Sequence, residues 1–217
     1  TQVKLMWVNY PHMPTGTNAL QETFEKLIAF GKKHKILIVN DNPYSFVLND
    51  TPQSILQVNG AKEIALELNS LSKTFNMAGW RVGGMVLGTA KFLEQVLKVK
   101  SNMDSGMFYG IQKGAIEALQ LSEAWFTTQN AQYEERRALI WKLADKLNCS
   151  YDRNTAGLFV WAKIPAEKTS EEMTDALLYN KNVFIAPGTI FGSQGEGYIR
   201  FSLCVSKEVI QEVIDRI

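Results

Sequence analysis

Short apolar runs are spaced regularly along the first half of the chain. They span residues 5–8, 36–39, 64–68 and 82–87, and each has the length of one strand. Polar and helix-favouring stretches separate them, and a further helix is expected over Lys91–Lys100. Continuously apolar strands that alternate with helices are typical of a sheet that is buried on both faces. The pattern therefore predicts an α/β fold with a largely parallel sheet.

A helix is expected between the first two of these strands. Its apolar positions recur at helical spacing and share one face: Leu20, Phe24, Leu27 and Ile28. Thr17 or Asn18 is expected to cap its N-terminus, because either side chain can accept a hydrogen bond from a backbone N–H of the first turn. Asn18 followed by Gln21 also resembles a capping box.

The second half of the chain has longer helical stretches. Helices are expected over 110–121, 129–147 and 170–179 and from 207 onwards, with strands over 158–164, 183–186 and 198–203. In the second of these helices, the charged run at 134–137 is expected on the solvated side. This mixture predicts an α+β domain. We place the domain boundary among the helices of residues 105–125, with one domain over 1–115 and a smaller one over 116–217.

Composition and charge narrow the functional classes. Hydrophobic residues make up 46% of the chain and the formal net charge is +1, so neither a nucleic-acid partner nor a membrane surface is expected. Cys149 and Cys204 make no disulfide framework, which favours a reducing compartment such as the cytoplasm. The two histidines, His12 and His34, have no cysteine cluster beside them, so no metal site is expected.

Reactive side chains converge on one edge of the predicted sheet. Asp41 follows the second strand, Tyr44 comes three residues later, and Lys73 follows the third strand after a short loop. Arg81 directly precedes the fourth strand and reaches the same edge if the intervening loop folds back. Ligands of open α/β sheets bind beyond the carboxyl ends of the strands. These residues are therefore candidates for a ligand site.

Taken singly, these residues also have structural interpretations. Asp41 can be a turn or capping residue, and Tyr44 can be a core aromatic with a solvated hydroxyl. Lys73 can be a surface charge, and Arg81 can belong to a structural ion pair. The stretch 70–73 also matches S-x-x-K of the serine β-lactamases, but the accompanying S-D-N and K-T-G do not occur in the sequence. We therefore reject the β-lactamase interpretation.

Together, an acid, a phenol, an amine and a guanidinium make the set that pyridoxal 5′-phosphate (PLP) uses. This cofactor needs a lysine that forms an imine with its aldehyde, and an acid against its pyridine nitrogen. Its phosphate needs cationic or N–H donors. The acid keeps the ring nitrogen protonated, so that the ring can accept the electrons released when a substrate bond breaks. The set therefore points to a PLP enzyme.

Motifs of one family occur in order along the chain. They are NYPHMPTG (9–16), NDNPY (40–44), SLSKTFNMAGWRVG (70–83) and GEGYIRFS (195–202). In order and spacing they resemble the motifs of class I/II PLP-dependent aminotransferases, which have fold type I and belong to the aspartate aminotransferase superfamily. The resemblance covers essentially the whole chain. It implies that residues 1–115 are the C-terminal part of the large PLP-binding domain and that 116–217 are the small C-terminal domain.

The resemblance implies catalytic roles for the residues at the sheet edge. Lys73 is expected to form the Schiff base with PLP. Once the substrate amine displaces it, the same lysine is expected to move the proton between the substrate Cα and the cofactor. Asp41 is expected to pair with the pyridine nitrogen, and Tyr44 is expected to donate a hydrogen bond to the phenolic oxygen.

The resemblance also implies roles in anion binding. Arg81 and Ser70 are expected to bind the cofactor phosphate, with Ser72 as a weaker candidate. Arg200, in the last motif, is expected to bind the α-carboxylate of the substrate through its two-pronged guanidinium. Without the motif, Arg200 reads as a surface residue on a strand.

The sequence departs from the family pattern at Met13. The family has an asparagine at this position, in N-P-T-G, and its side chain hydrogen-bonds the phenolic oxygen of the cofactor. A thioether is a weak acceptor and has no donor, so that bond cannot form here. We expect the pKa of the Schiff base to rise unless His12, Asn9 or Tyr44 compensates.

Length is a second departure. The chain starts directly before a strand-like stretch, and family members carry a further part of the large domain upstream, including a phosphate-binding loop at a helix N-terminus. We therefore expect the chain to be the C-terminal portion of an aminotransferase. Alone it is expected to bind PLP weakly or not at all and to be inactive. The parent enzyme is expected to be a homodimer that moves an amino group from an amino acid to a 2-oxo acid.

Other functions remain open from the sequence. A PLP-dependent lyase or decarboxylase can use the same lysine, aspartate and tyrosine, because the cofactor carries the chemistry. An aminotransferase-like effector domain of a transcription regulator is a further alternative, and its DNA-binding part would lie upstream. The amino donor cannot be read from the sequence, because Arg200 binds a group that all α-amino acids share.

Overall fold

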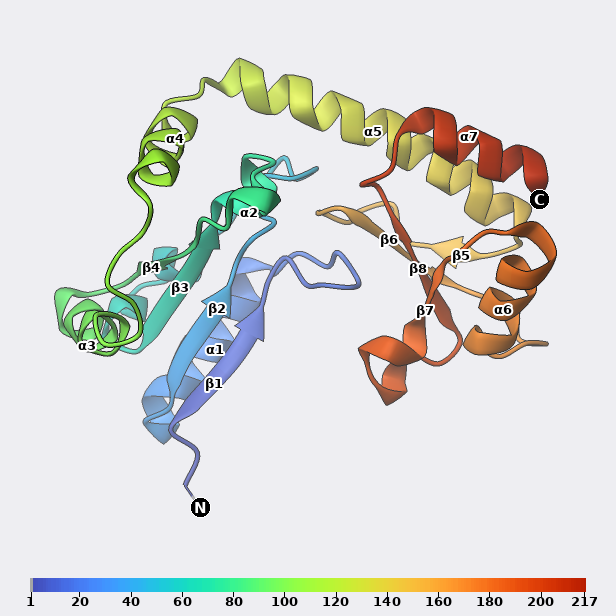
Figure 1. Ribbon diagram of the computed structural model, residues 1–217. Helices are drawn as coiled ribbons and strands as arrows, with labels where there is room; N and C mark the ends of the chain where they lie inside the picture. The colour runs from blue at the N-terminus through green and yellow to red at the C-terminus, as the bar shows by residue number, and fades with distance from the viewer. Residues whose placement is uncertain (1) are drawn as a thin grey trace. The chain divides into compact units, whose positions relative to one another are not determined.

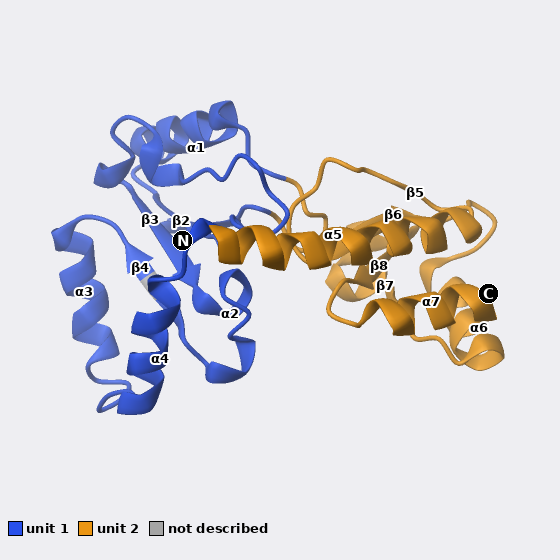
Figure 2. Ribbon diagram, turned by 90° about the horizontal axis from the view of Figure 1, so that it is seen from above, with its two compact units in different colours: residues 1–11, 18–123 blue, residues 12–17, 124–217 orange. Residues whose placement is uncertain are grey.

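The computed structural model of the chain describes residues 2–217, apart from the side chain of Met85. The chain forms two compact units, which Figure 2 colours separately. Unit 1 comprises Thr1–Pro11 and Asn18–Glu123, and unit 2 comprises His12–Thr17 and Ala124–Ile217. The boundary predicted at 115/116 falls within helix α4 (Tyr109–Leu119), whose Ala118 packs into a hydrophobic cluster of unit 1.

Unit 1 is built on a four-stranded sheet (Figure 1). Its strands, in spatial order, are β1 (Leu5–Asn9), β2 (Leu37–Asp41), β3 (Ala65–Ser70) and β4 (Gly83–Leu87). Strands β1, β2 and β3 are parallel, and β4 runs antiparallel to β3. Each strand coincides with one of the predicted apolar runs. The prediction of an α/β fold with a largely parallel sheet is therefore confirmed.

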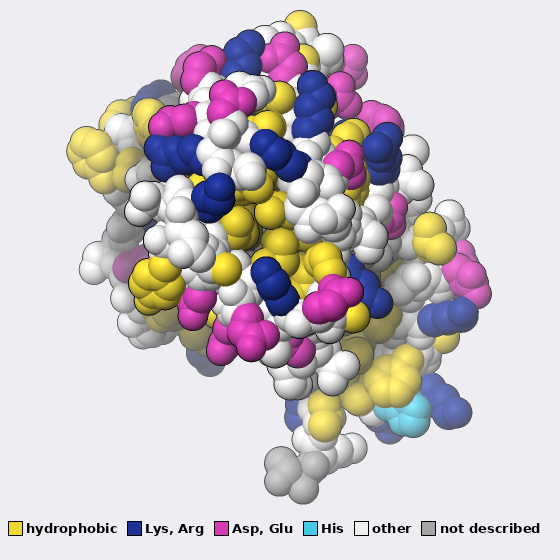
Figure 3. Space-filling view, turned by 90° about the vertical axis from the view of Figure 1, so that its right-hand side faces the viewer, with side chains coloured by type: hydrophobic (Ala, Val, Ile, Leu, Met, Phe, Trp, Pro, Cys, Tyr) yellow, Lys and Arg dark blue, Asp and Glu magenta, His cyan; other side chains and the backbone are white. Residues whose placement is uncertain are grey.

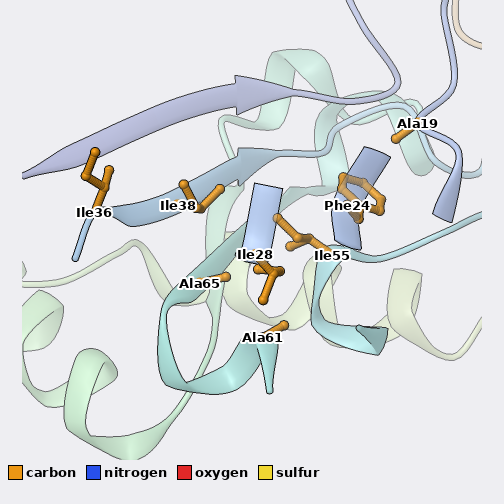
Figure 4. Packing of buried hydrophobic residues seen from close by; sticks show 8 residues of the cluster. All are labelled: Ala19, Phe24, Ile28, Ile36, Ile38, Ile55, Ala61 and Ala65. Atoms are coloured by element: carbon orange, nitrogen blue, oxygen red, sulfur yellow. The ribbon is translucent and has the colours of Figure 1, made fainter. Parts of the chain in front are cut away.

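A hydrophobic cluster between helix α1 and the sheet forms the core of unit 1. The helices of this unit are α1 (Gln21–His34), α2 (Leu71–Thr74), α3 (Ala90–Lys100) and α4, with 3-10 turns at Ile55–Gln57, Ala61–Glu63 and Ala78–Trp80. Figure 4 shows the buried residues of the cluster: Ala19, Phe24, Ile28, Ile36, Ile38, Ile55, Ala61 and Ala65. Burying one large side chain of this kind stabilises the fold by about 1.5–3 kcal/mol. Packing therefore holds α1 in place.

The N-terminus of α1 differs from the prediction. The helix begins at Gln21, its N-cap is Leu20, and no side chain caps it. Thr17 belongs to a loop of unit 2, and Asn18 Nδ2 instead donates to Asn49 Oδ1 at 3.4 Å. Leu20 is 68% exposed. The predicted cap was therefore wrong, because Thr17 and Asn18 bond to residues outside the helix, and the first predicted apolar position was wrong, because Leu20 is exposed.

Unit 2 combines helices with an antiparallel sheet. Its elements are α5 (Glu123–Lys146, with its first residue in unit 1), β5 (Ser150–Tyr151), β6 (Phe159–Lys163), α6 (Ser170–Lys181), β7 (Ala186–Pro187), β8 (Tyr198–Ser202) and α7 (Lys207–Arg216), with 3-10 turns at Gly188–Phe191 and Ser193–Gly195. The strand order is β5-β6-β8-β7, and all neighbours are antiparallel. The predicted helices and main strands are present. Only Ala186 of the strand predicted over 183–186 belongs to β7, and β5 was not predicted.

The two arginines of the charged run in α5 are not on the solvated side. The Arg137 side chain is only 14% exposed, and its Nη1 donates to Thr155 O at 3.1 Å. Arg136 Nη1 donates to Leu203 O at 3.1 Å. The two glutamates before them are exposed, as predicted. The arginines therefore tie α5 to segments that flank the sheet of unit 2, which a local charge pattern does not reveal.

An apolar pocket of about 350 Å³, open to solvent, lies in unit 2. Ile140 and Leu143 of α5, residues 182–186, and residues 209–213 of α7 contribute to its lining. In Figure 3, hydrophobic side chains gather in the middle of the face turned to the viewer, and acidic and basic side chains border them. Within residues 2–217, no helix has both the length and the apolar character needed to cross a bilayer.

The loop of residues 12–17 belongs to unit 2, although unit 1 residues flank it in the sequence. It closes on itself, because Gly16 N donates to His12 O at 2.7 Å and His12 N donates to Thr17 O at 2.9 Å. Ala156 N donates to Gly16 O at 2.8 Å and anchors the loop. Gly16 has φ +73°, and a Cβ atom there would lie 2.7 Å from Ala156 O. Only glycine fits this turn without strain.

Candidate active site

The carboxyl ends of the parallel strands form one edge of the unit 1 sheet. In the register of the sheet, Asp41 at the end of β2 lies between Asn9 of β1 and Leu68 of β3. Ser70 at the end of β3 lies opposite Gly83 at the start of β4. The predicted site residues of unit 1 therefore lie at strand ends of the same edge or within three residues of them.

Asp41 is the last residue of β2 rather than the first residue after it. Its side chain is half-buried, and this burial raises the pKa of the carboxyl group above its ordinary value of 3.8. Asn9 Nδ2 donates to the backbone oxygen of Asp41 at 2.7 Å. Among residues 2–217, no side chain or backbone group hydrogen-bonds or pairs with the carboxylate itself. Such a carboxylate suits a ligand group that carries a proton or a positive charge.

A buried polar pair lies next to Asp41 in the sheet. The fully buried Asn40 donates from Nδ2 to Glu67 Oε2 at 3.1 Å and accepts from Tyr10 N at 3.1 Å. Glu67 Oε2 also accepts from Ile55 N at 3.1 Å. The pair links β2, the middle of β3, the residue after β1 and a 3-10 turn, and so holds the backbone around Asp41. Sequence reasoning missed it, although a glutamate inside an apolar strand was a usable signal.

Lys73 lies in α2, a single helical turn that starts where β3 ends. Ser70 caps this turn, since its Oγ accepts from Ser72 N at 3.1 Å. The next residue anchors the turn to the strand beyond it, because Leu71 N donates to Val82 O at 3.2 Å. The half-buried Lys73 has an ammonium group that makes no hydrogen bond or ion pair within the described part of the chain. The fold thus places an amine without a protein partner at the site edge.

Tyr44 and Arg81 lie in segments next to the same edge. Tyr44 is buried in the loop after β2, and its carbonyl accepts from Val47 N at 3.0 Å. Arg81 is exposed, with φ +58°, and its Nη1 donates to Ala78 O at 2.9 Å. That bond uses one of the five N–H donors of the guanidinium. Unit 1 therefore gathers all the predicted site residues except Arg200, which belongs to unit 2.

Aromatic rings flank Arg200 in unit 2. This arginine lies in the middle of β8, next to Trp161 of β6. Its Cζ atom is 4.0 Å from the ring centroid of Phe159 and 4.4 Å from that of Phe191. Each such cation–π contact is worth about 0.5–2 kcal/mol. The rings therefore restrict the orientation of the guanidinium.

Sequence reasoning missed both phenylalanines that flank Arg200. Phe159 had a usable signal. It lies two residues before Trp161 on β6, so both side chains are on the same face of the sheet, and Trp161 is the cross-strand partner of Arg200. Phe191 had none, because it comes from a 3-10 turn. That turn packs closely on its surroundings: a Cβ atom on Gly188 would lie 2.1 Å from Gly195 O.

Met13 lies beside Arg200 within unit 2. Arg200 Nη1 donates toward Met13 Sδ at 3.5 Å. Met13, which replaces the asparagine of the family motif, therefore lies next to the arginine that we expect to bind carboxylate. A thioether is a weak acceptor, so it holds this N–H group only loosely.

Comparison with known proteins identifies the family of the chain. The family model described as aminotransferase class I and II matches residues 1–217. The chain belongs to this family. Aminotransferases of class I and II are PLP-dependent enzymes. The family resemblance of the motifs is thereby confirmed.

Two curated relatives of this aminotransferase chain are named LL-diaminopimelate aminotransferases. LL-diaminopimelate aminotransferase 2 of Trichormus variabilis is 41% identical over 217 residues, which cover 99% of the chain and 55% of that protein. LL-diaminopimelate aminotransferase of Aquifex aeolicus is 38% identical over 218 residues, which cover 100% of the chain and 56% of that protein. The chain thus spans about half the length of these relatives.

Solved structures of similar proteins have the same fold as this aminotransferase chain. Apo-BacF of Bacillus subtilis matches with a TM-score of 0.91 and 35% identity, over 99% of this chain and 55% of that one. The probable N-succinyldiaminopimelate aminotransferase of Thermus thermophilus matches with a TM-score of 0.89 and 31% identity, over 98% of this chain and 57% of that one. The expected fold type is therefore confirmed.

The donor set of unit 1 fits PLP. Asp41 is a half-buried carboxylate without a cation of the described chain beside it, and it suits a protonated pyridine nitrogen. Lys73 offers an amine that no described residue engages, and Arg81 and Ser70 offer donors for a phosphate. Met13 is the exception in unit 2, because it offers no donor for the phenolic oxygen.

Proposed function

We propose that the chain is part of a PLP-dependent aminotransferase that moves an amino group from an amino acid to a 2-oxo acid. One observation carries the proposal: the carboxylate of Asp41 and the amine of Lys73 both come from strand ends at one edge of the sheet. The names of the relatives favour amino-group transfer over the lyase, decarboxylase and regulator alternatives.

Residues of unit 1 are proposed to hold the cofactor and to move protons. When bound, PLP draws electrons from the bond that breaks at the substrate Cα. Asp41 keeps the pyridine nitrogen protonated, and Lys73 anchors the cofactor and carries the proton to and from the substrate Cα. Tyr44 donates a hydrogen bond to the phenolic oxygen.

Phosphate binding is assigned to the turn that carries Lys73 and to the segment after it. Arg81 supplies a charged donor, and Ser70 supplies a hydroxyl. Ser72 is the weaker candidate. A charge-assisted contact from Arg81 is the strongest of these interactions.

Arg200 is proposed to bind the α-carboxylate of the substrate. The rings of Phe159 and Phe191 lie against the guanidinium and restrict its orientation. A carboxylate accepts two parallel N–H bonds from a guanidinium. Lysine would provide the charge without the paired geometry.

The amino donor, the oligomeric state and the cellular compartment are separate proposals. LL-diaminopimelate belongs in the first screen of amino donors, because the curated relatives are named LL-diaminopimelate aminotransferases. We propose a homodimer, as the family resemblance implies. We also propose a cytoplasmic location, since the buried Cys149 and the exposed Cys204 are both free thiols.

Covalent trapping of PLP on Lys73 tests the proposed function. A protein that contains this chain and has the length of its relatives is incubated with PLP, reduced with borohydride and mapped by peptide mass spectrometry. We expect the cofactor mass on Lys73 and ¹⁵N transfer from a labelled amino acid to a 2-oxo acid. Both are expected to be lost in Lys73→Ala and in Lys73→Arg, which keeps the charge. The 217-residue chain alone is expected to trap little or no cofactor.

Transfer of ¹⁵N that survives Lys73→Ala would contradict the proposal. Cofactor trapped at another lysine would contradict it as well. Efficient trapping on Lys73 in the 217-residue chain would instead overturn the expectation that this chain alone binds PLP weakly or not at all.

A further inference from the structure

We propose that Met13 is an oxidation site: a peroxide converts its thioether to the sulfoxide, and the sulfoxide weakens the binding of a carboxylate by Arg200. The affinity effect rests on the proposed role of Arg200. The coupling between the two side chains rests on their contact alone, in which Arg200 Nη1 lies 3.5 Å from Met13 Sδ.

The loop that carries Met13 holds the sulfur near Arg200. Residues 12–17 close through hydrogen bonds between their own backbone groups, and His12 Nδ1 bonds Thr15 Oγ1 at 2.8 Å. Gly16 anchors the loop to Ala156 of the same unit at 2.8 Å. Because the backbone is fixed at both points, oxidation changes the chemistry at this contact rather than removing the side chain from it.

Met13 is also open to a small oxidant. Unit 2 contains Met13 and Met173. Met13 is 37% exposed, whereas Met173 is 7% exposed in α6. A peroxide in solution therefore reaches Met13 and is largely excluded from Met173, which provides a reference inside the same unit.

The chemistry converts a weak acceptor into a strong one. The sulfur attacks one peroxide oxygen, an S–O bond forms and the O–O bond breaks. The sulfur is oxidised by two electrons, and hydrogen peroxide leaves as water. The polar sulfoxide oxygen then accepts from the Arg200 guanidinium, where the thioether accepted only weakly. Methionine sulfoxide reductases reverse the change, so the site can be switched back.

The sulfoxide oxygen competes with a carboxylate for the same N–H groups. The flanking rings of Phe159 and Phe191 restrict the guanidinium, so it cannot turn freely to serve both acceptors. Loss of one charge-assisted hydrogen bond is expected to weaken carboxylate binding about tenfold, which corresponds to about 1.4 kcal/mol.

The test follows Arg200 and the carboxylate separately in a protein that contains this chain and has the length of its relatives. Hydrogen peroxide is added, and peptide mass spectrometry measures the sulfoxide fraction at each methionine. NMR then follows the Arg200 Nε–H resonance, assigned with Arg200→Lys, before and after titration with pyruvate. The variants are Met13→Leu, which keeps size without a sulfur, and Met103→Leu, which removes an exposed methionine of unit 1.

We expect peroxide to oxidise Met13 faster than Met173 and to shift the Arg200 resonance. Pyruvate affinity is expected to fall about tenfold and to recover after treatment with the reductases. Met103→Leu is expected to behave like the wild type, and Met13→Leu is expected to keep both its resonance and its affinity under peroxide.

An Arg200 resonance that does not move in the oxidised wild type overturns the proposal. An equal shift in Met13→Leu overturns it too. If pyruvate leaves the Arg200 resonance of the reduced wild type unchanged, the carboxylate role of Arg200 fails and the affinity effect fails with it. The peroxide-dependent shift then still decides whether Met13 and Arg200 are coupled.

Discussion

The fold keeps the carboxylate of Asp41 half-buried at the sheet edge, although its charged form is more stable in water. Burial penalises its charged form, and among the described residues no cation offsets the penalty. The folded pKa is raised, so the folded state binds more protons than the unfolded state between pH 3.8 and the raised value. Stability attributable to this group is present below pH 3.8 and is lost as the pH rises through the folded pKa. Active-site groups often destabilise a fold in this way.

Asp41→Asn is therefore expected to raise the free energy of unfolding slightly at pH 7, because it removes an unpaired charge. The gain is expected to shrink as the pH falls and to vanish well below 3.8, where the aspartate is protonated in both states. Urea unfolding of unit 1 at several pH values measures the difference. The exposed Asp50→Asn serves as the matched control and is expected to leave stability unchanged. A less stable Asp41→Asn at pH 7 would mean that the carboxylate is compensated.

At the scale of elements, the N-terminus of α6 organises the turn that leads into β8 and so to Arg200. Thr169 and Glu172 form a capping box, with the Thr169 N–H donating to Glu172 Oε2 at 2.9 Å. The buried Ser170 Oγ accepts from Gly197 N at 2.9 Å, and Glu196 Oε1 accepts from Ser170 N at 2.8 Å. The backbone N–H of Thr169 lowers the pKa of Glu172, so this contribution is present at neutral pH and is lost as the pH falls through the lowered pKa.

Thr169→Ala is expected to lower the free energy of unfolding of unit 2 by about 1 kcal/mol, because Glu172 N loses its side-chain acceptor. Thr169→Ser keeps the hydroxyl and is expected to retain most of the stability. Chemical denaturation followed by circular dichroism makes the comparison. Equal losses in the two variants would show that the methyl group of Thr169, not its hydroxyl, matters.

At the scale of the whole molecule, residues 12–17 belong to a different structural unit from the residues on either side of them in the sequence. This loop follows β1 in the sequence, yet Ala156 of unit 2 holds it through the carbonyl of Gly16. A motif near the N-terminus therefore completes the unit built mainly from the C-terminal half. The contact between Met13 and Arg200 exists only because of this arrangement.

Gly16→Ala is expected to destabilise unit 2 by at least about 1–2 kcal/mol, because a left-handed backbone disfavours a Cβ atom and the space is filled by Ala156. Hydrogen exchange is expected to speed up around residues 150–163 and to stay unchanged in β1, β2 and β3. Gly79→Ala, where an added Cβ atom meets nothing within 4 Å, is the control. Faster exchange confined to unit 1 would contradict the assignment of the loop to unit 2.

Local patterns were enough to find the strands of unit 1 and the residues at their ends. A continuous apolar run of strand length is costly to leave in water, so its burial in a sheet is largely independent of distant sequence. For that reason Asp41 and Lys73 could be assigned to one edge of the sheet from the sequence alone. The helix at 170–179 and the final helix were equally local. The family motifs added the expected roles, which stay predictions.

Only the tertiary structure decided which distant side chains meet. The partners of Arg137, the uncapped start of α1, the Asn40–Glu67 pair and the rings beside Arg200 all depend on contacts between segments far apart in sequence. No periodicity encodes such contacts, because their energy arises only after each segment has packed. The placement of Met13 against Arg200 is of this kind: the sequence set the residue types, and the closure of the fold around the loop at 12–17 brought them together.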